Sequence, residues 1–241
     1  MLALLPVLLL TLFALFPPQA LELDDPNTLS VIFAAIYEGL ILRTILFFGC
    51  AWVFMNLFRG EVIDRSLHYY LLCPVRRDIL VVGKYLSGLV TTVLLFAGTT
   101  LVSNLLLHSP RGFAAANQYF FVGVGLSHLL TYLCITTLAC VGYGAFFLAA
   151  GLLVRNPIIP ALLLYGWEWI NFLLPPVLKK ISVIHYLQSL TPVPMSEGPF
   201  ALVSEPTPAW ISIPSLLLVT ILVLMFAGWR IRRMEIRYGG D

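Results

Sequence analysis

The sequence predicts an all-α integral membrane protein with six transmembrane helices. Of its 241 residues, 60% are hydrophobic and only 11% are charged, whereas a soluble domain has about 25% charged residues. The mean hydropathy is +0.94. About six apolar stretches approach the roughly 20 residues that cross a hydrocarbon layer about 30 Å thick. They leave no room for a sizeable soluble domain, so we expect residues 1–241 to form one transmembrane domain.

The predicted spans are apolar runs separated by polar or proline-containing breaks. Their approximate ranges are 1–17, 31–58, 79–107, 120–154, 158–174 and 211–229. A signal peptide is the alternative for the first range, because it is short and precedes Pro18-Gln19-Ala20, but it lacks the basic leading region of such peptides. The fourth range would be about 50 Å long as one straight helix, too long for an upright crossing, so we expect its glycines to bend it or to allow close packing.

Polar residues mark the ends of the second and third spans. The second span is predicted to end at Arg59-Gly60-Glu61, where a polar segment begins. Asp78 stands where an N-cap carboxylate would accept hydrogen bonds from the first free amides of the third span. A long segment before the sixth span is amphipathic from about residue 179 and then proline-rich.

The distribution of lysine and arginine predicts the orientation, because these residues gather in cytoplasmic loops. With a cytoplasmic N-terminus and six spans, the inner side carries Arg59, Arg65, Arg76, Arg77, Lys84, Arg155, Arg230, Arg232, Arg233 and Arg237. The outer side carries only Arg111, Lys179 and Lys180. Both termini are therefore predicted to be cytoplasmic, with the chain in the plasma (inner) membrane.

The sequence contains no motif of an enzyme or of a metal or cofactor site. There is no G-x-S-x-G, no H-E-x-x-H and no paired glutamates at helical spacing. Val82-Gly83-Lys84 lacks the upstream glycine and the following serine or threonine of a phosphate-binding loop. We expect no ATP binding by this chain and no nucleic-acid partner. The cysteines at 50, 73, 134 and 140 are predicted to be small buried hydrophobic residues.

Three charged residues lie inside predicted spans: Glu38 and Arg43 in the second and Glu168 in the fifth. A charge in this environment costs several kcal/mol unless it is paired or hydrated, so such residues are candidates for function. Glu38 and Arg43 are five residues apart, about 140° around an α-helix, which disfavours a direct pair and predicts separate partners. Two roles remain open for them, either contacts between helices or the lining of a transport route.

The loop between the second and third spans has the pattern of a short amphipathic helix at the membrane surface. Apolar residues recur at helical spacing between Val62 and Leu71, while charged residues occupy other faces. Pro74 is expected to end this helix. Within and after the loop stand Glu61, the Pro-x-x-Arg run from Pro74 to Arg77, then Asp-Ile-Leu, and Gly83-Lys84-Tyr85.

In these motifs, and in the six-span layout, the chain resembles the type-2 permeases of the ATP-binding-cassette transporters. The resemblance implies a membrane-spanning permease subunit, an exporter, driven by a separate ATPase subunit and paired with a second permease subunit as a homo- or heterodimer. It also implies short re-entrant helices in the outer segment around residues 192–200, before the sixth span. The residues that it places in the ATPase-coupling loop are Glu61, Asp64, Arg65, Arg76 and Arg77.

One feature departs from that family, because its members usually have a cytoplasmic amphipathic helix before the first span, whereas this chain begins with apolar residues. Two other classes share the predicted topology. A secondary transporter would be expected to show two similar halves with helices broken at matching positions, and a membrane-embedded scaffold would need no ATPase. Co-purification of an ATPase would distinguish a permease subunit from both of these classes.

Overall fold

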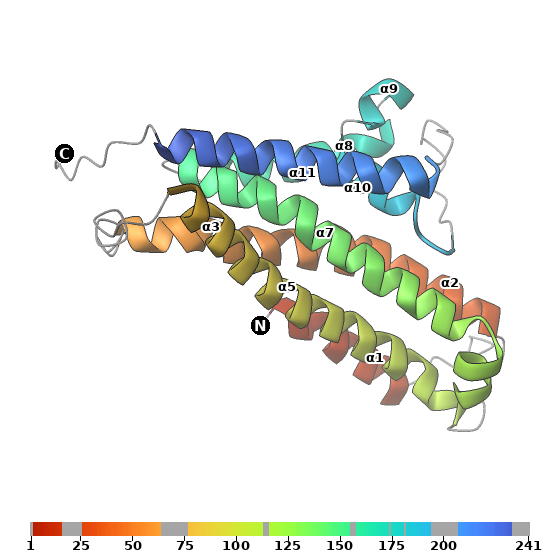
Figure 1. Cartoon of the computed structure of the whole chain (residues 1–241). Helices are drawn as coiled ribbons and strands as arrows, with labels where there is room; N and C mark the ends of the chain where they lie inside the picture. Colours follow the sequence, from red (N-terminus) through yellow and green to blue (C-terminus); the bar gives the residue numbers. More distant parts are fainter. Residues whose placement is uncertain are drawn as a thin grey trace.

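A computed structural model of the chain describes residues 2–15, 26–63, 77–112, 116–154, 158–173, 175–180, 182–193 and 207–232. Within these residues there are helices and no β-strand, which confirms the predicted all-α class. The long helices run roughly along one another in a bundle, with α1 (Leu5–Leu15) beside α5 (Arg77–His108) (Figure 1). A 3₁₀ turn, η1 (Leu2–Leu4), precedes α1.

Four helical stretches in the described residues are long and apolar enough to cross a membrane. The first is a continuous helix made of α2 (Pro26–Ile36), η2 (Tyr37–Leu46) and α3 (Phe47–Ile63). The others are α5, α7 (Gly125–Leu153) and α11 (Ala209–Arg232). Their positions agree with the second, third and sixth predicted spans and with most of the fourth.

Two further apolar helices are shorter. Helix α1 has 11 residues and α8 (Ile158–Ile170) has 13, so at 1.5 Å per residue they are about 16 and 20 Å long, less than the hydrocarbon thickness. The 3₁₀ turn η5 (Asn171–Leu173) follows α8. They occupy the first and fifth predicted spans, and the count of six crossings stays a prediction.

Helix α7 is at the centre of the bundle, where it contacts α3, α5 and α11. Its apolar span is 67% buried, against 22% for α11. Small residues allow α3 to approach it closely. A Cβ atom at Gly151 would lie 2.9 Å from the carbonyl oxygen of Met55, and one at Gly144 would lie 2.5 Å from Cζ of Phe54. The α3–α7 contact therefore depends on these glycines.

The second predicted span ends where expected, since the apolar stretch ends at Phe58, and the helix itself is described as far as Ile63. The structure corrects two other expectations about helix ends. Helix α5 begins at Arg77, so Asp78 lies in its first turn rather than at the N-cap, and its carboxylate pairs with Arg232 of α11. The fourth predicted span is interrupted, since the π-helical turn η4 (Gln118–Val122) ends at an extended Gly123 before α7 begins.

The cysteines follow the prediction only in part. Cys50 and Cys140 are buried, but Cys134 is exposed because no described residue covers that side of α7. Cys73 lies outside the described residues.

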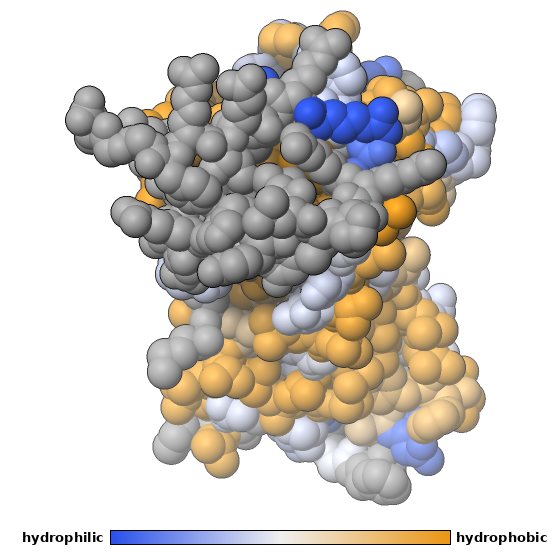
Figure 2. Space-filling view, turned by 60° about the vertical axis from the view of Figure 1, so that its left-hand side comes forward, coloured by the Kyte–Doolittle hydropathy of each residue, from blue (hydrophilic) through white to orange (hydrophobic). Residues whose placement is uncertain are grey.

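The surface agrees with a membrane environment. Figure 2 shows mostly apolar side chains over the described part of one face, with hydrophilic side chains toward the two ends of the view. Large apolar residues are exposed along α5 and α11, among them Leu94, Leu218 and Met225. Exposing this apolar surface to water would cost free energy, whereas contact with lipid tails would not.

Candidate functional site

Glu168 holds the short helix α10 (Val183–Gln188) in place. After α8 and η5 the chain turns at Pro175 into the one-turn helix α9 (Pro176–Lys179) and reaches Ser182, the N-cap residue of α10. The carboxylate of Glu168 accepts hydrogen bonds from the backbone N–H groups of Val183 and Ile184, both at 3.2 Å, and from the Ser182 hydroxyl. Glu168 is only 4% exposed. These donors solvate the buried carboxylate, and the carboxylate in turn satisfies the first free amides of α10.

Arg43 contacts Trp169, the residue that follows Glu168. Its guanidinium Cζ is 5.8 Å from the centroid of the Trp169 ring, a cation–π contact between η2 and α8. Its positive charge also attracts Glu168, the neighbour of Trp169 in the sequence. Arg43 therefore links the second predicted span to the fifth.

Glu38 is joined to the other end of α10. The side-chain amide of Gln188 donates a hydrogen bond to Glu38 Oε2 at 3.1 Å, and Glu38 is 8% exposed. The Ser189 hydroxyl is 3.1 Å from that of Ser212 in α11. Helix α10 is thus bonded to α8 and to η2, and Ser189, the residue after it, is bonded to α11. We call Glu38, Arg43, Glu168, Ser182 and Gln188 the α10 polar cluster.

Two buried oxygen atoms near Glu38 have no hydrogen-bond partner in the described part of the chain. They are the side-chain oxygen of Gln188 and the hydroxyl oxygen of Tyr132. Tyr132 lies within the range of electrostatic interaction with Glu38. Buried polar atoms normally have a partner. The cluster can therefore accept hydrogen bonds from water or from a polar ligand.

The structure brings two of the three predicted intramembrane charges, Glu38 and Glu168, to one short helix, and Arg43 to Trp169 beside Glu168 in the sequence. Glu38 and Arg43 contact different groups, as predicted, but the reason given for it was wrong: residues 37–46 form a π-helix, so the α-helical angle of about 140° does not apply to them. Sequence reasoning missed Ser182 and Gln188. The sequence feature that could have indicated them is the polar side of the amphipathic stretch that begins near Lys179, to which both residues belong.

A second junction lies at the base of the loop between α3 and α5. Lys84 Nζ donates a hydrogen bond to the carbonyl oxygen of Leu57 at 2.5 Å and lies 4.6 Å from the centroid of the Phe58 ring. The next residue, Tyr85, donates from its hydroxyl to the carbonyl oxygen of Val141 in α7 at 3.0 Å. Lys84 and Tyr85 therefore tie α5 to both α3 and α7, and we call this contact the Lys84 junction.

The predicted coupling residues lie largely beyond what the structure describes. Asp64, Arg65 and Arg76 are outside the described residues. Glu61 belongs to α3 and Arg77 to α5 by their backbone, but their side chains are not described. In the predicted outer segment, positions 192 and 193 are described and 194–200 are not. Re-entrant helices before the sixth span stay a prediction.

The described residues contain no group of three histidine, cysteine, aspartate or glutamate side chains that could hold a metal ion. Comparisons with protein-family models, curated proteins and solved structures found no match for the chain. The fold and the apolar surface define its class as an all-helical membrane protein.

Proposed function

We propose that the chain is the membrane-spanning permease subunit of an ATP-binding-cassette transporter of the type-2 class. In this proposal it is an exporter subunit with six crossings and two cytoplasmic termini. It pairs with a second permease subunit and is driven by a separate ATPase that docks on the loop between α3 and α5. The resemblance in that loop is the origin of the proposal.

The Lys84 junction is the observation that supports it most. An ATPase can drive transport only if movement of the docked loop reaches the helices around the route. Lys84 links the helices on both sides of the loop, and Tyr85 links them to the central helix α7. Both residues belong to the Gly-Lys-Tyr motif that carries the resemblance. A displacement of the loop would therefore move α3 and α5 together and would reach α7 through Tyr85.

The α10 polar cluster supports a transport role as well. It places two buried carboxylates, Glu38 and Glu168, inside the bundle, where a charge is costly unless it has a use or a partner. Helix α10 contacts α7 and α11 and is bonded to η2 through Gln188 and Glu38. A shift of α10 would break the Gln188–Glu38 hydrogen bond and would expose polar atoms between these helices.

The test is purification of the tagged chain from its native membrane in a mild detergent. We expect an ATPase with a phosphate-binding loop to co-purify and ATP hydrolysis to be measurable in the complex. A chain that carries no ATPase when isolated under several mild conditions would contradict the proposal and favour a secondary transporter or a scaffold.

Charge reversal then tests the docking site. Glu61→Lys and Arg65→Glu should leave insertion and abundance unchanged but should release the ATPase, because reversing a charge in an interface can cost several kcal/mol. Lys180→Glu is the matched control, since this exposed residue lies after α9, on the side predicted to be extracellular. Full ATPase binding in both loop variants would show that the loop only anchors the chain at the lipid headgroups.

A further inference from the structure

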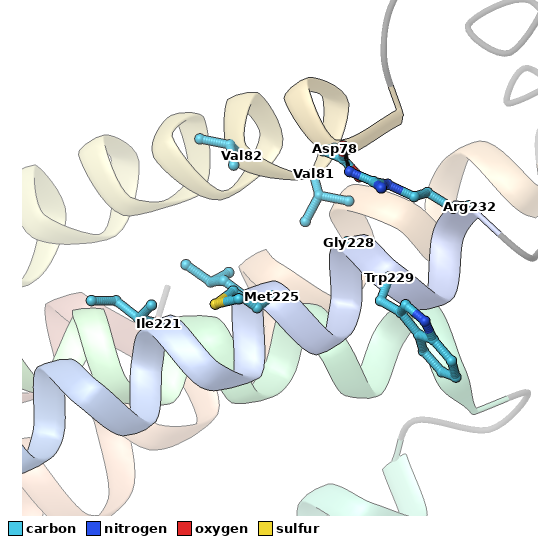
Figure 3. Close-up of a pocket in the computed structure, with 9 residues that line it drawn as sticks. Asp78, Val81, Val82, Ile221, Met225, Gly228, Trp229 and Arg232 are labelled. Atoms are coloured by element: carbon cyan, nitrogen blue, oxygen red, sulfur yellow. Dashed lines mark hydrogen bonds and ion pairs between the residues drawn. The ribbon is translucent and has the colours of Figure 1, made fainter.

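A groove runs between α5 and α11 at the end of the bundle where Arg232 lies. Its volume is about 520 Å³. Helix α5 contributes Asp78, Val81 and Val82, and α11 lines the other side (Figure 3). The α11 residues are Ile221, Leu224, Met225, Gly228, Trp229 and Arg232. Apart from Asp78 and Arg232, this lining is almost entirely apolar.

The groove is open to the outside of the described bundle. Met225 is 66% exposed, and Val82 and Ile221 are also exposed. From Ile221 to Arg232 the lining extends over 11 helical steps, about 16 Å along α11 at 1.5 Å per residue. One leaflet of the hydrocarbon core is about half of 30 Å thick. The groove therefore matches one lipid tail in both length and polarity.

One end of the groove carries a negative and a positive charge side by side, on Asp78 and Arg232. Arg232 Nε donates to Asp78 Oδ1 at 2.6 Å, and Arg232 Nη2 pairs with Asp78 Oδ2. The pair leaves 64% of the Arg232 side chain and 34% of the Asp78 side chain exposed. A headgroup that carries a phosphate and an ammonium complements this arrangement, with the phosphate toward the guanidinium and the ammonium toward the carboxylate. An ammonium with N–H groups can also donate charge-assisted hydrogen bonds to Asp78.

We propose that the α5–α11 groove is a binding site for one phosphatidylethanolamine molecule, with an acyl chain between the helices and the headgroup over the Asp78–Arg232 pair. The lipid in this site is a structural ligand and not a cargo. The inference does not depend on the transporter proposal, because it uses neither the ATPase nor the α10 polar cluster.

The first test measures lipid retention by the full chain. The protein is purified in detergent, incubated with equal amounts of phosphatidylethanolamine, phosphatidylcholine and phosphatidylglycerol, and analysed by native mass spectrometry. We expect one phosphatidylethanolamine per chain to survive delipidation, about tenfold over the other two lipids. Equal retention of all three would overturn the proposal, because that is the behaviour of ordinary annular lipid. Preferential retention of phosphatidylglycerol would overturn the headgroup assignment.

Gly228→Leu fills the groove. A Cβ at Gly228 would meet only Asp78 Oδ1, at 3.6 Å, so the leucine can enter the groove without a backbone clash. It should reduce phosphatidylethanolamine retention at least tenfold. Gly98→Leu is the matched control, since it lies 20 residues, about 30 Å, along α5 from Asp78 and nothing lies within 4 Å of its Cβ position. Val82→Trp fills the same groove from α5 and replaces Gly228→Leu if that variant does not fold.

The role of the Asp78–Arg232 pair in headgroup binding is tested with the double variant Asp78→Asn and Arg232→Gln. It removes both charges and keeps side chains of similar shape. This double variant should lose the preference for phosphatidylethanolamine over phosphatidylcholine while remaining helical. An unchanged preference would overturn the role of the pair. If Gly228→Leu leaves lipid retention intact but converts a dimer into a monomer, the occupant of the groove is a second copy of the chain and the lipid proposal fails.

Discussion

Replacing Glu168 by alanine should release the start of α10. Three hydrogen bonds end on the Glu168 carboxylate, two from backbone N–H groups and one from Ser182. Each contributes about 1 kcal/mol net, so the loss is about 3 kcal/mol if no water replaces the carboxylate. At 1.4 kcal/mol per factor of ten, opening of α10 becomes about a hundredfold more frequent. Glu168→Gln should have a smaller effect, because its amide keeps an oxygen for some of these donors but turns an NH₂ group toward another.

The assay is amide hydrogen exchange of the chain in detergent or nanodiscs, read at Val183 and Ile184. Exchange should accelerate about a hundredfold in Glu168→Ala and less in Glu168→Gln, while the amides of α7 keep their protection. Ile170→Ala is the control, because Ile170 lies on the same helix and is exposed. Unchanged exchange at both α10 amides in Glu168→Ala would refute the view that this carboxylate holds α10.

Three further substitutions and one topology test probe other contacts. Gly151→Ala should lower the free energy of unfolding by about 1–3 kcal/mol in a denaturation experiment, because its methyl group would meet the Met55 backbone, whereas Gly166→Ala, which has nothing within 4 Å, should be nearly neutral. Gln188→Leu should cost about 1–3 kcal/mol by removing a donor to the buried Glu38 carboxylate, and wild-type stability would contradict that bond. Lys84→Met keeps an apolar stem near Phe58 but removes the donor to Leu57, so spin-label distances between α3 and α5 should broaden near the loop; unchanged distances would argue against the Lys84 junction. Cysteines at positions 25 and 197 should react with an impermeant thiol reagent from outside, and labelling of the C-terminal tail from outside would refute six crossings with cytoplasmic termini.

The sequence located the long helices well because crossing a membrane is a local property. Hydropathy over about 20 residues decides whether a segment can lie in lipid, and this information is contained within the segment. The ranges 31–58, 79–107 and 211–229 therefore agree closely with α2–η2–α3, α5 and α11. A bend or close packing was expected from the glycines of range 120–154, but the position of the break, at Gly123, depends on the turn η4 before α7.

The candidate site was predicted only as separate charges. Glu38, Arg43 and Glu168 could be identified because ionisable residues are rare and costly in apolar spans. Their partners could not, because Gln188 is 150 residues from Glu38 in the sequence and Ser182 precedes a helix of only six residues. The pairing of Asp78 with Arg232 joins residues that are 154 positions apart along the chain.

The sequence by itself determined the class of the molecule, the positions of its longest helices and the identity of its intramembrane charges. Each of these follows from the transfer of a segment or a side chain between water and lipid. Only the tertiary structure decided that α10 joins Glu168 to Glu38, that Lys84 ties α5 to α3, and that α5 and α11 leave a groove between them. Those features depend on which helices pack against one another, and the packing is set by shape and small residues on surfaces that are uniformly apolar in sequence.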